Sequence, residues 1–181
     1  MQRMPDPRSP RSHATTPARR SGVLRRMSSH SLFREGAVLK VTAFVDGASR
    51  GNPGPAGYGV YMTTDNGEIL SVSGFLGTAT NNVAEYAGLI DALALAQEEG
   101  ATEVEIISDS LLLVNQMLGK FRVKHANLIP LYEKAQRMAR GFRRFTIRHT
   151  LRAGNKEADR LANLAVDRSA GRAVERHRVD S

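Results

Sequence analysis

One long amphipathic segment separates three strand-like segments from a fourth, and this order restricts the folds open to the chain. Residues 82 to 99 carry apolar side chains at helical spacing, and Gly100 follows as a helix stop. A helix of this length can return the chain to the start of the sheet, so a strand at 103 to 108 can run parallel to a strand at 39 to 46. The sequence therefore predicts a mixed sheet with a helical crossover.

The other segments complete an α/β order. Residues 57 to 63 and 68 to 76 are rich in β-forming side chains, and Asn66-Gly67 between them is a strong hairpin signal. After the crossover strand we expect, in chain order, a short helix at 110 to 118, a helix at 127 to 139, a strand at 143 to 150 and a closing helix at 155 to 166. The predicted order is β-β-β-α-β-α-α-β-α.

Composition divides the 181 residues into one domain and two flanks. Residues 1 to 38 are rich in Arg, Ser and Pro and have no sustained apolar period, so they predict a disordered leader. Residues 39 to 167 form the predicted domain, and residues 168 to 181 a disordered basic tail. We expect a cytoplasmic protein, although such a leader leaves organelle targeting open and Met27 is an alternative start.

Several classes of protein are excluded by composition. The chain has no cysteine, so it has neither a disulfide framework nor a thiolate metal site. No apolar run approaches the roughly 20 residues that span a bilayer, so we expect a soluble protein without a membrane partner. A single domain with no additional apolar stripe predicts a monomer.

The net charge of +8 belongs to the flanks, because residues 39 to 167 carry equal numbers of basic and acidic side chains. Within the domain the two signs are separated along the chain. Residues 39 to 119 have two basic and ten acidic side chains, and residues 120 to 148 have nine basic and one acidic. A charge run is most often a solvated surface, but a basic segment is also what nucleic-acid binding requires.

Four carboxylates stand near the ends of predicted elements. Asp46 ends the first strand, Asp109 follows the fourth, and Glu85 and Asp159 lie in the first turns of helices. Parallel neighbouring strands would bring Asp46 and Asp109 to the sheet edge at which ligands bind in open α/β folds. Carboxylates so close together need a hard divalent cation to stay ionised. The pattern predicts metal-dependent phosphate chemistry.

Each acid also has a purely structural interpretation. Glu85 follows Asn82 by three residues, as in a capping box, and Asp109 could be a helix N-cap. Asp46 could belong to an Asp-Gly turn, and Asp159 could be solvated beside an apolar stripe. For each acid taken alone, the structural interpretation is the commoner one, so the surrounding motifs decide.

Four motifs surround these acids. They are residues 46 to 59 (DGASRGNPGPAGYG), 80 to 86 (TNNVAEY), 108 to 110 (SDS) and 154 to 162 (GNKEADRLA). In this order, and spanning residues 40 to 166, they resemble the four motifs of type 1 ribonuclease H.

The resemblance implies a ribonuclease H-like α/β fold, a five-stranded mixed sheet with three antiparallel and two parallel-added strands flanked by helices. It also implies an endonuclease that hydrolyses the RNA strand of RNA/DNA hybrids with two Mg²⁺ or Mn²⁺ ions and leaves 5′-phosphate and 3′-hydroxyl ends. By motif position, the catalytic acids and metal ligands would be Asp46, Glu85, Asp109 and Asp159.

Contacts to both strands of the hybrid are implied as well. The glycine-rich turn would let backbone groups approach the RNA strand through Gly47, Ala48, Ser49, Arg50 and Gly51, although a plain strand-end loop is the alternative. Asn81 and Asn82 have donors and acceptors suited to sugar edges. Asn52 and Thr80 would grip a phosphate of the DNA strand.

The chain departs from the best-known family pattern between the third motif and the last strand. Many members have a longer, strongly basic helical protrusion there, whereas this chain has only the short segment 119 to 128. The chain therefore resembles the handle-less branch of archaea and many bacteria. Contacts to phosphates through Lys120, Arg122 and Lys124 would partly replace the missing grip without adding sequence preference.

A second departure concerns the catalytic histidine of the family's flexible loop. His149 lies ten residues before Asp159, which fits by counting, but its strand parity with Phe145 and Ile147 favours a packed side chain. Arg152 is the alternative at the loop position, and a third possibility is that neither residue assists product release.

Two other functions stay open from the sequence. One is a catalytically weak nucleic-acid-binding module, against which the presence of all four acids argues. The other is a DNA nuclease of the same fold, against which the glycine-rich turn and the Asn81-Asn82 pair argue.

Overall fold

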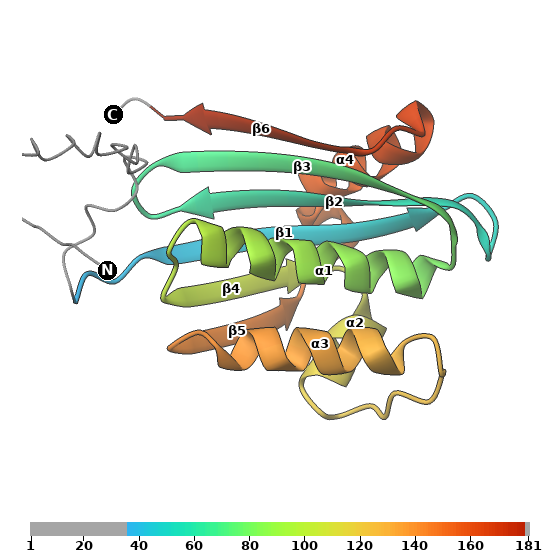
Figure 1. Ribbon diagram of the computed structural model, residues 1–181, viewed down its shortest axis with the longest axis horizontal. Coiled ribbons are helices and arrows are strands. Elements are labelled where there is room, and N and C mark those ends of the chain that lie inside the picture. Colours follow the sequence, from blue (N-terminus) through green and yellow to red (C-terminus); the bar gives the residue numbers. More distant parts are fainter. Residues whose placement is uncertain (1–35, 180–181) are drawn as a thin grey trace, which may run out of the picture. The chain divides into compact units, whose positions relative to one another are not determined.

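A mixed six-stranded sheet with the order β5-β4-β1-β2-β3-β6 organises the structure (Figure 1). The computed structural model describes residues 36 to 179, so the predicted leader lies, except for its last three residues, outside the described residues. In chain order the elements are β1 (Lys40–Ser49), β2 (Gly54–Thr64), β3 (Glu68–Ala79), α1 (Asn81–Glu98), β4 (Glu103–Ser108), α2 (Leu111–Met117), α3 (Ile129–Arg140), β5 (Arg144–His149), the 3₁₀ helix η1 (Arg152–Gly154), α4 (Lys156–Arg168) and β6 (Arg172–Arg178).

Strand direction changes at β1. This strand pairs antiparallel with β2 and parallel with β4, and β5 in turn is parallel to β4. Val45 pairs with Ser108, and Ser108 pairs with His149, so the carboxyl ends of β1, β4 and β5 meet at one edge of the sheet. The predicted parallel pairing of the first and fourth strands is confirmed, as is the hairpin between β2 and β3.

Helices lie on both sides of the sheet, with α1 and α3 in front of it and α4 behind it in Figure 1. Val41, Ala43 and Val45 of β1 are fully buried, at the alternate positions of a strand that packs one face against a helix. Leu89 and Leu93 of α1 are fully buried in the same core cluster. The buried face of α1 is therefore the one that carries Leu89 and Leu93. The predicted apolar stripe at Val83, Ala87, Ile90 and Ala94 is only partly buried, so the prediction placed the buried face of this helix incorrectly.

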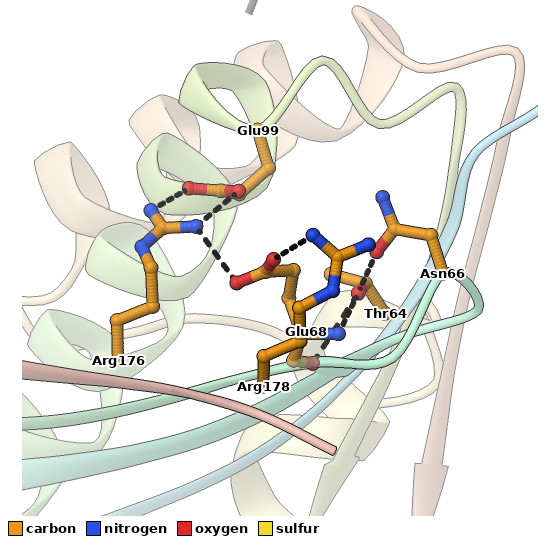
Figure 2. A network of polar contacts seen from close by, with 6 residues as sticks. All are labelled: Thr64, Asn66, Glu68, Glu99, Arg176 and Arg178. Carbon is orange, nitrogen blue, oxygen red and sulfur yellow. Dashed lines mark hydrogen bonds and ion pairs between the residues drawn. The ribbon is translucent and has the colours of Figure 1, made fainter. Parts of the chain in front are cut away.

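The sixth strand corrects the prediction of a disordered tail and of a five-stranded sheet. β6 pairs antiparallel with β3 from Glu68–Arg178 to Gly74–Arg172. All of its residues are exposed, so no apolar periodicity marks it in the sequence. Ion pairs attach it instead: Arg176 contacts Glu99 and Glu68, as Figure 2 shows. A strand stabilised by backbone pairing and ion pairs is invisible to an argument from hydrophobic pattern.

The segment between α2 and α3 contains no helix from residue 118 to residue 128, as the short third-motif connection predicts. Within the described residues, no helix is both long and apolar enough to cross a membrane.

Candidate active site

Asp46 and Asp109 meet because their strands are parallel neighbours. Asp46 lies in β1, and Asp109 follows the last residue of β4. The pairing of Val45 with Ser108 places the two acids at the same level of the sheet edge. This is the arrangement that the strand order predicts.

Glu85 reaches the same place because α1 packs closely against the end of β1. A Cβ at Gly47 would lie 2.4 Å from the backbone nitrogen of Glu85, so only glycine permits this approach. The helix is capped by Thr80, whose hydroxyl accepts a hydrogen bond from the Val83 N–H at 3.2 Å. The capping-box interpretation of Asn82 and Glu85 is therefore wrong, and Glu85 is free to face the cleft.

Asp159 is brought in by α4, which packs on β2. A Cβ at Gly59 would lie 2.2 Å from the carbonyl oxygen of Ala158, so the helix backbone rests on a glycine of the sheet. Asn155, at the start of α4, donates from Nδ2 to the carbonyl oxygen of Val45 at 2.9 Å. These contacts fix the first turn of α4, which carries Asp159, beside the end of β1.

Three of the four acids form a tight group. Ligand oxygens of Asp46, Glu85 and Asp109 all lie within 4.8 Å of one another. Asp46 is 6% exposed and Glu85 is 4% exposed, whereas Asp109 is partly exposed. Asp159 lies outside this trio but lines the same open cleft, whose volume is about 590 Å³. The cleft is lined by Asp46, Gly47, Ala48, Ser49, Asn81, Glu85, Asp109, Ser110, His149, Thr150, Leu151, Arg152, Asp159 and Asn163.

The sequence left open that Asp46 belongs to a turn and that Asp109 caps a helix, and the structure tests both interpretations. The N-cap of α2 is Ser110, whose hydroxyl accepts from the Leu113 N–H, so Asp109 does not cap that helix. Asp46 does accept a local bond, from the Gly47 N–H to Oδ1 at 2.9 Å. Both residues lie within β1, so Asp46 does not belong to a turn, and a carboxylate that accepts one such bond can still bind a cation.

Burial and mutual repulsion dominate the electrostatics. Burial, and then the negative charge of Asp109, raise the pKa of Asp46 from 3.8 to about 7. Burial, and then the charge of Asp46, raise the pKa of Glu85 well above its ordinary value. Oε2 of Glu85 is buried and has no hydrogen-bond partner among the described residues. An unsatisfied carboxylate oxygen within an all-oxygen group fits a hard divalent cation.

His149 and Arg152 both line the cleft. His149 is exposed, and its Nε2 lies 3.2 Å from the carbonyl oxygen of Asp109, so the expectation of a packed histidine is wrong. His149 is the last residue of β5, at the end of the sheet's edge strand, where strand parity is a weak guide to burial. Arg152, in η1, places Nη2 3.4 Å from Oδ1 of Asp159. The structure brings both residues to the acids.

The glycine-rich turn and the second motif are only partly in the cleft. Gly47, Ala48, Ser49 and Asn81 line it, but Arg50, Gly51, Asn52, Thr80 and Asn82 do not. The Asn52 side chain accepts from the Asn81 N–H at 3.1 Å, which ties the turn to the start of α1. The exposed guanidinium of Arg50 pairs with Asp167 near the end of α4.

The basic residues predicted to contact phosphates lie apart from the acids. Lys120 and Arg122 line a separate groove of about 470 Å³, together with Phe121 and Tyr132, whereas Lys124 lines neither cleft nor groove. Sequence reasoning did not single out four residues that line the cleft: Ser110, Thr150, Leu151 and Asn163. Spacing offers a signal for Asn163, since a residue four after Asp159 shares its helix face.

Comparison with known proteins agrees with this geometry. The family described as Reverse transcriptase-like matches residues 44 to 165. Ribonuclease HI of Halobacterium salinarum is 41% identical over 129 residues, which is 71% of this chain and 65% of that protein. Its crystal structure superimposes with a TM-score of 0.68 at 40% identity, and the match covers 98% of the solved chain. This chain belongs to the type 1 ribonuclease H family.

Two further relatives extend the comparison. The bifunctional protein Rv2228c of Mycobacterium tuberculosis is 52% identical over 134 residues, and its N-terminal RNase H domain superimposes with a TM-score of 0.70. The match covers 73% of this chain but only 37% of Rv2228c, so the chain spans about a third of that relative's length. LC11-RNase H1, solved in complex with an RNA/DNA hybrid, is 38% identical with a TM-score of 0.67, covering 71% of this chain and 98% of that one.

Proposed function

We propose that this protein is a ribonuclease H that hydrolyses the RNA strand of RNA/DNA hybrids and leaves 5′-phosphate and 3′-hydroxyl ends. The observation that carries the proposal is the trio of Asp46, Glu85 and Asp109, whose ligand oxygens lie within 4.8 Å of one another in an open cleft and of which the first two are buried. Such a trio costs free energy in the absence of a cation, so its presence favours a role in catalysis over one in stability.

The same residues would hold two Mg²⁺ or Mn²⁺ ions. Asp46, Glu85, Asp109 and Asp159 would hold the ions, and Asp46 is central among them because the charges of both Asp109 and Asp159 act on it. Bound ions would supply activation of the attacking water and neutralisation of charge on the leaving oxygen.

The residues of this chain then orient the substrate. Gly47, Ala48 and Ser49 form one wall of the cleft, where backbone groups can approach the sugar edges of the RNA strand and sense its 2′-hydroxyls. Asn81 lies at the same wall. Asn82 would also contact sugar edges, and Asn52 and Thr80 would grip a phosphate of the DNA strand.

His149 and Arg152 would act on the product side of the reaction. Both lie at the cleft, and Arg152 already neutralises part of the charge of Asp159. We propose that one of them assists departure of the cleaved strand. Comparison of His149→Ala with Arg152→Ala would assign the role. Substitution of the residue responsible should lower kcat and leave KM for the hybrid nearly unchanged.

The direct test is incubation of the purified full chain with labelled RNA/DNA hybrid, duplex RNA and duplex DNA, each with Mg²⁺, with Mn²⁺ or with EDTA. Cleavage of the RNA strand of the hybrid alone, and only with a divalent ion, is expected. Cleavage of duplex DNA would favour a DNA nuclease, and hybrid binding without cleavage would favour a binding module. A monomeric state and a cytoplasmic location stay predictions, which size-exclusion chromatography and cell fractionation would test.

A further inference from the structure

Asp159 is held differently from the other three acids. It lies on α4, outside the trio, and its side chain is 31% exposed. Two nitrogen donors among the described residues reach its Oδ1: Nη2 of Arg152 at 3.4 Å and Nδ2 of Asn163 at 3.3 Å. The position of this carboxylate therefore depends on what those two donors do.

The two donors are not equivalent. The side chain of Arg152 is 80% exposed, so water competes for its bond and the guanidinium can leave at little cost. Asn163 is partly buried and lies one helical turn after Asp159. Its Nδ2 also donates to the main-chain carbonyl oxygen of Asp159 at 2.9 Å. One amide nitrogen thus contacts both the backbone and the carboxylate of the same acid.

Helix stability does not account for Asn163. Asn is a poorer helix former than Ala, and a short polar side chain that bonds to a carbonyl one turn back competes with the helix. Elsewhere in α4 the positions that pack on the sheet are apolar, as at Ala158, Ala162 and Ala165. Asn163 instead lines the cleft. The amide is therefore better explained by the carboxylate it contacts than by the fold.

We infer that Asn163 is a positioning residue that holds the carboxylate of Asp159 at the divalent-cation site of the cleft. This inference rests on the proposed function, because it assumes that Asp159 contributes to cation binding. Because the Asn163 amide also donates to the main chain of α4, it would hold the Asp159 carboxylate in place whether or not Arg152 stays paired with it. Partners of ligating carboxylates commonly contribute to metal affinity in this way.

The test is a double-mutant cycle on Mn²⁺ binding. Mn²⁺ is titrated into the full chain without nucleic acid, for wild type, Asn163→Ala, Asp159→Asn and the double variant. Asn163→Ala should weaken Mn²⁺ affinity about 10-fold, and should add nothing in the Asp159→Asn background, because it acts through Asp159. Affinity within twofold of wild type for either single variant, or a further 10-fold loss in the double variant, would overturn the inference.

Two more measurements separate positioning from packing. In EDTA, Asn163→Ala should melt at or above the wild-type temperature, because Ala is the better helix former. Its kcat on the hybrid should fall about 10-fold at an unchanged KM. Arg160→Ala is the matched control, since Arg160 lies on the same helix and contacts Glu157 rather than the cleft, and it should leave Mn²⁺ affinity unchanged. If wild type binds Mn²⁺ but cleaves no hybrid, the proposed function fails while the cycle still tests Asn163.

Discussion

Arg176 on β6 donates to both carboxylate oxygens of Glu99 at the end of α1, with Nη1 2.9 Å from Oε2 (Figure 2). Glu99 is the C-cap residue of α1 and is only 8% exposed, so its charge needs a partner. β6 lies beyond residues 44 to 165, which match the family. A strand outside the shared domain therefore neutralises a buried acid inside it.

Arg176→Ala should destabilise the protein by about 1 to 2 kcal/mol, because it leaves Glu99 buried without its bidentate partner. The value is modest because the Arg176 side chain is 42% exposed and solvent screens the pair. Urea unfolding measures the change. Arg178→Ala is the control, since Arg178 is 68% exposed and contacts Glu68 at 3.6 Å, and it should have a much smaller effect. Equal effects of the two substitutions would contradict the role given to Glu99.

Asp46→Asn should abolish hybrid cleavage and stabilise the metal-free protein, with a gain that depends on pH. Folding raises the pKa of Asp46 from 3.8 to about 7. The protonated side chain is therefore compatible with burial, whereas its ionisation lowers the stability of the folded protein as pH rises from about 4 to about 7. Asn never ionises, so its advantage should be small at pH 4 and on the order of 2 kcal/mol or more at pH 8. Thermal unfolding in EDTA at both pH values checks this, and a gain that is equal at both would refute it.

Gly59→Ala should displace α4 and remove Asp159 from the cleft. The added Cβ would meet the Ala158 carbonyl oxygen at 2.2 Å, which is backbone and cannot rotate away. We expect the free energy of unfolding to fall by about 1 to 3 kcal/mol. We also expect most of the cleavage activity to be lost under conditions in which the variant stays folded. Circular dichroism melts and hybrid cleavage assays measure the two effects. Gly141→Ala is the control, since its nearest atom would lie 3.2 Å away, far from the acids, and activity should survive.

Lys120→Ala combined with Arg122→Ala should weaken hybrid binding and lower its salt dependence, with kcat unchanged. These basic side chains line a groove separate from the acids, where they can contact phosphates of the hybrid. Each phosphate contact contributes about one unit to the slope of log affinity against log salt concentration. Fluorescence anisotropy over a salt series measures both quantities. Arg143→Ala with Arg144→Ala removes two charges beside the start of β5, away from the acidic cleft, and should change the slope less.

Much of the site was accessible from sequence because its residues are local to recognisable elements. Asp109 follows the last residue of β4, whereas Asp46, predicted at the end of the first strand, lies three residues before the end of β1. The parallel pairing of these two strands brings both acids to the same level of the sheet. Capping interpretations failed for Glu85 and Asp109 because several polar residues compete at each helix start, and Thr80 and Ser110 take the caps. Local chemistry allows any of these polar residues to cap the helix, and the packing of the helix on the sheet selects one of them.

By itself, the sequence determined the element order and the parallel crossover, since apolar periodicity and turn residues are encoded over short distances. It also singled out the four acids, through the local motifs that surround them. Only the tertiary structure decided that β6 joins the sheet, that His149 faces the cleft and that the face of α4 with Asp159 and Asn163 lines the same cleft. Each of these depends on polar pairing between positions that leave no apolar pattern. Hydrogen bonds and ion pairs of this kind need particular atoms within about 3 Å of each other. The completed fold alone brings those atoms together.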